Sequence, residues 1–182
     1  MNKLLIIIIA IFVAIAAVFF IASYTQFAQD TSDDITTNTE ASTSWRNIEI
    51  KDAKTDETFK ISDFAGKKIL LESFAVWCPT CLKQQKEIQK LKQENIVHIS
   101  IDTDPNENEN SVIKHVEKHG FQWRYSVSPT EMTQSLINEF GVEIVNAPSS
   151  PVILICEDQS ARLLKRGLKS SDVLLEEIER GC

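Results

Sequence analysis

The sequence lacks an excess of basic residues. Its 182 residues include 19 lysines and arginines against 26 aspartates and glutamates, which gives a formal net charge of −7. Proteins that bind nucleic acid concentrate positive charge on one face, so we expect no nucleic-acid partner. The acidic balance instead favours solubility.

A complete set of metal ligands is also missing. Only Cys78 and Cys81 have C-x-x-C spacing, and no second such pair or matching histidine pair supplies the four ligands of a structural zinc site. His115 and His119 are four residues apart in a predicted helix, but no third ligand accompanies them, so we expect them on a solvated face. The sequence therefore predicts neither a bound metal nor a cofactor.

Charge and proline are absent from Leu4 to Ala22. As a helix this run would be about 28 Å long, close to the roughly 30 Å hydrocarbon core of a bilayer. Lys3 precedes the run and Asp30 is the first acidic residue after it, an asymmetry that places the N-terminus in the cytoplasm. We therefore expect residues 1–28 to be a signal anchor of a single-pass cell-membrane protein whose remaining residues are extracytoplasmic.

A cleaved signal peptide is the alternative for this segment. The apolar run is longer than the usual h-region of roughly 7–15 residues, and the small-residue positions around Ala22 and Ala28 are poor cleavage sites. No cysteine directly follows the run, which excludes a lipoprotein anchor. Both interpretations place the rest of the chain outside the cytoplasm.

The most specific feature that is present is Trp77-Cys78-Pro79-Thr80-Cys81, between an apolar segment and a helical one. A dithiol at the start of a helix lies where the helix dipole and free backbone N–H groups favour a thiolate, the nucleophile of disulfide exchange. Pro79 suits the first helical position. We predict that Cys78 is the exposed nucleophile and Cys81 the resolving thiol, with a stable non-catalytic disulfide as the alternative.

The rest of the pattern predicts an α/β chain with a central mixed sheet flanked by helices. Residues 29–44 are polar and read as a flexible linker, so the globular domain is expected at 45–182. Expected elements are an N-terminal hairpin at 46–61, strands at 68–75, 96–101, 123–127 and 152–156, and helices at 79–94, 108–119, 130–140 and 172–179.

With the Trp-Cys-x-x-Cys motif between a strand and a helix, the chain resembles the thioredoxin superfamily. More narrowly, it resembles the membrane-anchored thiol–disulfide oxidoreductases related to TlpA and ResA. The resemblance covers roughly residues 45–180, and Val112 to Gly141 matches the strand–helix insertion of this branch. It implies a thioredoxin-like fold with a TlpA-type central insertion.

Two further site residues follow from the resemblance. The family places a buried acid five residues before the motif tryptophan, which here is Glu72. Burial should raise its pKa and let it exchange a proton with Cys81, and a solvent-facing glutamate is the alternative. The family also places a cis-proline before the next strand. Pro151 is the candidate, with Pro148 as the alternative.

A cis-proline beside the dithiol would let the preceding backbone pair with a bound peptide. We therefore assign Pro151, together with Trp77 and Pro79, to substrate binding. Trp77 is expected to be a packing and surface residue beside the thiol.

The resemblance implies a protein that reduces protein disulfides, such as those of apocytochrome c or other envelope thiols. A membrane electron donor of the DsbD or CcdA type would re-reduce it. A disulfide-forming oxidant remains an alternative, although the large helical insertion of DsbA is missing. A copper chaperone would need C-x-x-x-C, and a peroxiredoxin-like peroxidase would need Pro-x-x-x-Thr-x-x-Cys; neither pattern occurs at the motif.

The remaining cysteines are Cys156, in a predicted buried strand, and Cys182, the terminal residue. Cys156 is most simply a small core residue. A Cys156–Cys182 disulfide and a terminal thiol that forms mixed disulfides are the alternatives.

Overall fold

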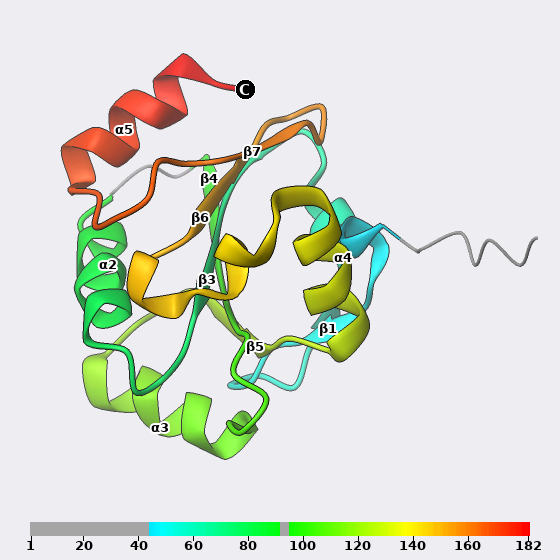
Figure 1. The fold of residues 1–182 in the computed structure, drawn as a ribbon, viewed down its shortest axis with the longest axis vertical. Coiled ribbons are helices and arrows are strands. Elements are labelled where there is room, and N and C mark those ends of the chain that lie inside the picture. Colours follow the sequence, from blue (N-terminus) through cyan, green and yellow to red (C-terminus); the bar gives the residue numbers. More distant parts are fainter. Residues whose placement is uncertain (1–43, 92–94) are drawn as a thin grey trace, which may run out of the picture. The chain divides into compact units, whose positions relative to one another are not determined.

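A five-stranded mixed β-sheet forms the centre of the computed structural model, which describes residues 44–91 and 95–182 (Figure 1). The neighbouring strands β5, β4 and β3 are parallel, β6 runs antiparallel to β3, and β7 runs antiparallel to β6. In spatial order the strands are β5 (Arg124–Val127), β4 (Ile96–Asp102), β3 (Lys68–Phe74), β6 (Val152–Ile155) and β7 (Ala161–Leu163). The predicted α/β class with a central mixed sheet is confirmed.

Helices cover both faces of this sheet (Figure 1). The helices α2 (Pro79–Gln89), α3 (Glu109–His119) and α5 (Ser171–Arg180) pack on one face, and α4 (Thr130–Phe140) packs on the other. The central strand β3 is buried on both sides, which explains why apolar residues occupy both of its faces. Ile69 and Leu71 join the core under α4, whereas Leu70 and Phe74 face the helices of the opposite layer.

The ends of the helices follow from their capping residues. Asn108 accepts a hydrogen bond from Ser111 N–H and begins α3, and Ser170 does the same for α5 through Val173 N–H. Gly120 ends α3 in a left-handed conformation, as a C-terminal glycine often does. Helix α2 ends at Gln89, earlier than the predicted end near residue 94; residues 92–94 lie outside the described part of the chain.

The predicted N-terminal hairpin is present but short. Its strands β1 (Ile50–Lys51) and β2 (Thr58–Phe59) pair antiparallel. Two 3₁₀ helices between α4 and β6 were not predicted, η3 (Val142–Val145) and η4 (Ala147–Ser149). The sequence there reads as a loop because each element is a single turn with no periodicity to detect.

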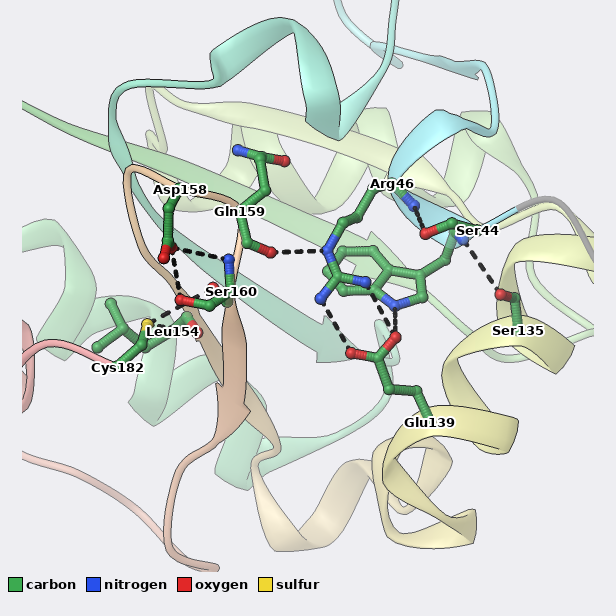
Figure 2. Close-up of polar contacts among 10 residues, drawn as sticks. Ser44, Arg46, Ser135, Glu139, Leu154, Asp158, Gln159, Ser160 and Cys182 are labelled. Carbon is green, nitrogen blue, oxygen red and sulfur yellow. Dashed lines mark hydrogen bonds and ion pairs between the residues drawn. The ribbon is translucent and has the colours of Figure 1, made fainter.

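The segment before β1 docks through the 3₁₀ helix η1 (Trp45–Asn47). Trp45 is completely buried, and its indole N–H donates to Glu139 of α4 at 2.7 Å. Both terminal nitrogens of Arg46 donate to the same carboxylate at 2.9 Å, and its Nε donates to the Gln159 carbonyl at 3.0 Å (Figure 2). These contacts link the start of the domain to α4 and to the turn between β6 and β7.

The C-terminus is tied to the sheet by a Cys156–Cys182 disulfide, with a Cα–Cα distance of 5.9 Å. Figure 2 shows Cys182 beside the turn after β6, where its sulfur lies 3.5 Å from the Ser160 carbonyl oxygen. Of the alternatives for these two residues, the structure therefore contains the disulfide rather than a free core thiol at Cys156.

The predicted membrane anchor at Leu4 to Ala22 lies outside the described residues, as does nearly all of the predicted linker. From residue 44 onward, apart from 92–94, no helix combines the length and hydrophobicity that a membrane crossing needs.

Candidate active site

The Cys-x-x-Cys motif lies where β3 ends and α2 begins. Cys78 is the N-cap of α2 and Pro79 occupies the first turn, as predicted. Cys78 and Cys81 form a disulfide with a Cα–Cα distance of 5.3 Å. The Cys81 backbone N–H donates to the Cys78 sulfur at 3.1 Å, so a thiolate at Cys78 would accept one of the free N–H groups of the helix and be stabilised by its dipole.

The prediction that Cys78 is exposed is wrong for this oxidised form. Its exposed fraction is 1%, as is that of Cys81, because both side chains pack in an apolar cluster with Phe74, Val112 and Ala147. Trp77 is instead the exposed residue of the motif, at 58%. Cys78 is reached through a hollow that it helps to line.

The prediction of a cis-proline at Pro151 is also wrong. No peptide bond is cis among the residues that the structure describes, and Pro151 is buried. Its carbonyl accepts a hydrogen bond from Ser73 N–H at 3.1 Å, which continues the β3–β6 pairing by one residue. The alternative, Pro148, is exposed and lines a groove together with Trp77.

The 3₁₀ helix η4 packs against α2 and brings backbone to the second cysteine. The Ala147 carbonyl oxygen lies 3.1 Å from the Cys81 sulfur, so a reduced Cys81 thiol would have a hydrogen-bond acceptor in place. No sequence pattern indicates this contact, because it joins residues 66 positions apart.

Glu72 is completely buried in β3, and burial raises the pKa of its carboxyl group to about 8. The hydrogen bond from Ser100 Oγ, at 2.8 Å, opposes this shift, as do the nearby Gln85 side chain and the charge of Lys169. Trp123 Nε1 donates to Ser100 Oγ at 3.0 Å and holds it in place. The predicted burial and raised pKa are confirmed, and the carboxyl group is protonated at neutral pH.

Gln85 lies near Glu72 on the helix that carries the cysteines. It lies four residues after Cys81, one turn along the buried face of α2. His115 Nε2 contacts Gln85 Oε1 at 2.6 Å, whereas the Gln85 amide nitrogen and Glu72 Oε1 have no hydrogen-bond partner among the described residues. The expected solvated position of His115 is wrong, because this ring is buried, and burial lowers its pKa to about 4.

Lys169 is a second buried ionisable group beside Glu72. Its ammonium group donates to the carbonyls of Ser150, Lys165 and Gly167, and burial lowers its pKa to about 8. The Lys169 backbone pairs with the buried Gln84 side chain through two hydrogen bonds. Sequence reasoning missed Lys169, because a lysine in a polar loop reads as a solvated residue.

The acidic loop after β4 holds the motif from outside. Glu107 accepts the Val76 backbone N–H at 2.6 Å, and Asp104 accepts the Trp77 indole N–H at 2.6 Å. No site role was predicted for this loop from the sequence. The available signal was its position, because β4 is parallel to β3 and the C-terminal ends of neighbouring parallel strands meet at one edge.

Asp102 ends β4 beneath this loop. Burial raises the pKa of its carboxyl group to about 8, and the nearby carboxylates of Glu107 and Asp104 act in the same direction. Its Oδ1 accepts the Asp104 backbone N–H at 2.9 Å, which shapes the loop that carries both partners of the motif.

Two hollows flank Trp77. The first, which we call the α3 hollow, has a volume of about 510 Å³ and lies between residues 76–79 with Leu82 and the α3 residues Ser111, Lys114, His115, Lys118 and His119. The second, the η4 hollow, has a volume of about 550 Å³ and lies between Trp77, the acidic loop and η4. Cys78 lines only the first.

Comparison with known proteins places this architecture in a family. The Redoxin family model matches residues 28–172, most of the chain. The chain belongs to the Redoxin family. A segment of 37 residues is 46% identical to the thiol:disulfide interchange protein DsbE of Pasteurella multocida (strain Pm70), a match that covers 20% of each protein's length.

Solved structures share the fold of this redoxin. A thiol:disulfide interchange protein of the thioredoxin family from Chlorobium tepidum TLS has a TM-score of 0.58 at 14% identity, over 74% of this chain and 92% of its own. MTB DsbF, in its mixed oxidised and reduced forms, has a TM-score of 0.58 at 15% identity, over 75% and 96%. The fold is therefore thioredoxin-like, and the family and the Cys-x-x-Cys pair at disulfide distance support an oxidoreductase of this superfamily.

Proposed function

We propose that this redoxin exchanges electrons with protein disulfides through Cys78 and Cys81 and acts mainly as a reductase. The observation that carries the proposal is the disulfide at the N-terminus of α2 with a protonated glutamate buried beneath it. This arrangement supplies a stabilised thiolate and a proton carrier, the two groups that disulfide exchange requires.

The reaction starts from the reduced dithiol. The Cys78 thiolate attacks one sulfur of the substrate disulfide, the substrate S–S bond breaks, and the departing substrate thiolate takes up a proton. Cys81 then loses its proton and attacks the Cys78 sulfur, which releases the second substrate thiol and forms the Cys78–Cys81 disulfide. Two electrons and two protons pass from the protein to the substrate.

Glu72 serves the second step of this reaction. With a pKa of about 8, about one tenth of the Glu72 carboxyl groups are ionised at pH 7, and this ionised form accepts the proton that Cys81 loses. Gln85, one turn from Cys81 on the buried face of α2, lies near Glu72. In the reverse direction the same carboxyl group returns the proton to Cys81.

Trp77 and the groove behind it bind the substrate polypeptide. Trp77 is exposed and fixed by its hydrogen bond to Asp104, and Pro148 rather than Pro151 lines the groove beside it. Pro79, also exposed, borders the α3 hollow on the opposite side of the cysteines.

The chain works outside the cytoplasm, tethered through the apolar run at Leu4 to Ala22. Its substrates are envelope proteins with oxidised cysteines, apocytochrome c among them, and a membrane donor of the DsbD or CcdA type re-reduces Cys78–Cys81. Support for this setting comes from the sequence pattern and from the similarity of a 37-residue segment to a thiol:disulfide interchange protein, DsbE.

The direction of electron flow is tested by the reduction potential of the Cys78–Cys81 couple, measured in the full chain with Cys156 and Cys182 both changed to Ser. A potential near that of thioredoxin, about −270 mV, would support a reductase. A potential near about −120 mV, as in DsbA, would contradict it and indicate a disulfide-forming oxidant.

A further inference from the structure

The two walls of the α3 hollow differ in chemistry. Residues 76–79 and Leu82 provide a largely apolar wall with Cys78 at its edge. The opposite wall is one face of α3, from which Lys114 and Lys118 project beside His119. None of the described residues that line this hollow is acidic, although acidic residues outnumber basic ones in the chain as a whole.

The two lysines have no competing partner in the structure. Among residues 44–91 and 95–182, neither Lys114 nor Lys118 forms an ion pair, whereas Lys51 at the opposite end of α3 pairs with Glu109. The positive potential extends into the hollow: besides burial, the charge of Lys118 lowers the pKa of both His115 and His119.

Cys78 lies within this positive field. Since Cys78 lines the hollow, a substrate sulfur that it attacks must lie at the hollow, and the atoms bonded to that sulfur lie within it or across its rim. The η4 hollow on the far side of Trp77 is lined by Asp104 and by no lysine, arginine or histidine. The two sides of the motif therefore present opposite charge to a bound disulfide.

We propose that the α3 hollow binds a carboxylate of the disulfide substrate, carried within a few bonds of the sulfur that Cys78 attacks. Lys114 and Lys118 receive the negative charge, and the apolar wall accommodates the carbon chain that links it to the sulfur. This inference rests on the proposed exchange at Cys78 and specifies which disulfides the redoxin prefers. The carboxylate comes either from an acidic residue beside the cysteine of a protein substrate or from a small thiol compound that itself carries a carboxylate.

The test uses the reduced full chain and three small disulfides of similar size: dithiodipropionate, which is anionic, hydroxyethyl disulfide, which is neutral, and cystamine, which is cationic. Second-order rate constants are measured by stopped flow for the wild type and for Lys114→Glu and Lys118→Glu. The ratio of variant to wild type is taken for each disulfide, so that differences in leaving-group acidity cancel.

Lys67→Glu is the matched control. It changes the net charge by the same amount, and Lys67 is exposed just before β3, at the opposite end of that strand from the motif. We expect each hollow variant to lower the rate with dithiodipropionate about fivefold, to raise it with cystamine, and to leave hydroxyethyl disulfide within about twofold. Lys67→Glu should leave all three within about twofold.

If a hollow variant changed the rates with all three disulfides equally, the inference would be overturned, because the change would reflect altered reactivity of Cys78 alone. The inference would also be overturned if Lys67→Glu changed the rates as much as the hollow variants do. If the wild type reacts readily but without charge preference, only this inference fails. If it reacts with none of the three, the proposed function fails as well.

A second arm distinguishes the two sources of the carboxylate. Peptide disulfides with Glu or Gln beside the cysteine are compared with oxidised glutathione in the same variants. If the wild type reacts faster with the Glu peptide than with the Gln peptide and the lysine variants do not, the carboxylate belongs to an acidic segment of a protein substrate. If the lysine variants lose rate only with oxidised glutathione, it belongs to a small carboxylate-bearing thiol. Loss of the preference in both overturns the proposal.

Discussion

The Cys78–Cys81 and Cys156–Cys182 disulfides have similar Cα–Cα distances, 5.3 and 5.9 Å, but they lie in different surroundings. The first joins residues three apart at the start of a helix, beside a hollow, an exposed tryptophan and a buried acid. The second joins residues 26 apart and ties the chain end to the edge of β6. The comparison teaches that the environment of a cysteine pair, rather than its geometry, separates exchange chemistry from structural support.

The largest expected effect is that disulfide exchange is lost when the Cys78–Cys81 pair is disrupted but not when the Cys156–Cys182 pair is removed. Cys78→Ser should lower the rate of protein disulfide reduction by at least about 10³-fold, because serine cannot form the mixed disulfide. The double change Cys156→Ser with Cys182→Ser should leave that rate within about twofold. An insulin-reduction assay with both proteins checks this, and a comparable loss in the two would remove the distinction.

The second effect concerns the Cys156–Cys182 disulfide and is expected in protein stability rather than in activity. Removing Cys156–Cys182 should lower the free energy of unfolding by about 3.5 kcal/mol, because the open chain regains the entropy of a loop closed over 26 residues. Urea denaturation of the oxidised wild type and the double serine variant measures the difference. A change below about 1 kcal/mol would show that the C-terminal disulfide contributes little.

A smaller effect is expected from Glu72→Gln, and it depends on pH. The folded-state pKa of Glu72, about 8, lies above the ordinary value of 4.5, so the folded state holds a proton that the unfolded state has lost. The wild type therefore loses stability as the pH rises between these values, by about 2 kcal/mol from pH 5 to pH 7. Glutamine cannot ionise and avoids this loss.

We therefore expect the stability of Glu72→Gln relative to the wild type to increase from pH 5 to pH 7. Resolution of the mixed disulfide should slow in the same variant, because Cys81 loses its proton partner. Urea denaturation across this pH range measures the first effect and single-turnover kinetics the second. A stability difference that stays constant with pH would contradict the raised pKa.

The smallest effect is expected from Trp77→Ala, which separates substrate contact from chemistry at the catalytic pair. The rate with a protein disulfide should fall about tenfold, because an exposed aromatic contact is lost. The rate with hydroxyethyl disulfide should change less than about threefold. Equal losses with both substrates would indicate that Trp77 acts by holding the Cys78 loop through Asp104.

The sequence alone was sufficient for the strands and helices with strong periodicity. Helix α4 begins and ends where predicted, at 130 and 140, and a glycine directly after it marks its end. Strand β4 is one residue longer than predicted. The short elements η3 and η4 were missed because single turns carry no period. At the site, the burial of Glu72 agrees with its place in an apolar strand.

The sequence by itself determined the α/β class with a mixed sheet and the cysteine pair at a helix N-terminus, because both depend on local spacing and hydrophobic pattern. The thioredoxin-like fold and the buried Glu72 followed from the family resemblance that the motif carries. Only the tertiary structure decided that Cys182 reaches Cys156, that Pro148 rather than Pro151 lines the groove, and that Lys114 and Lys118 face Cys78. These relations join residues far apart in the chain, and they depend on how the helices and loops pack on the sheet.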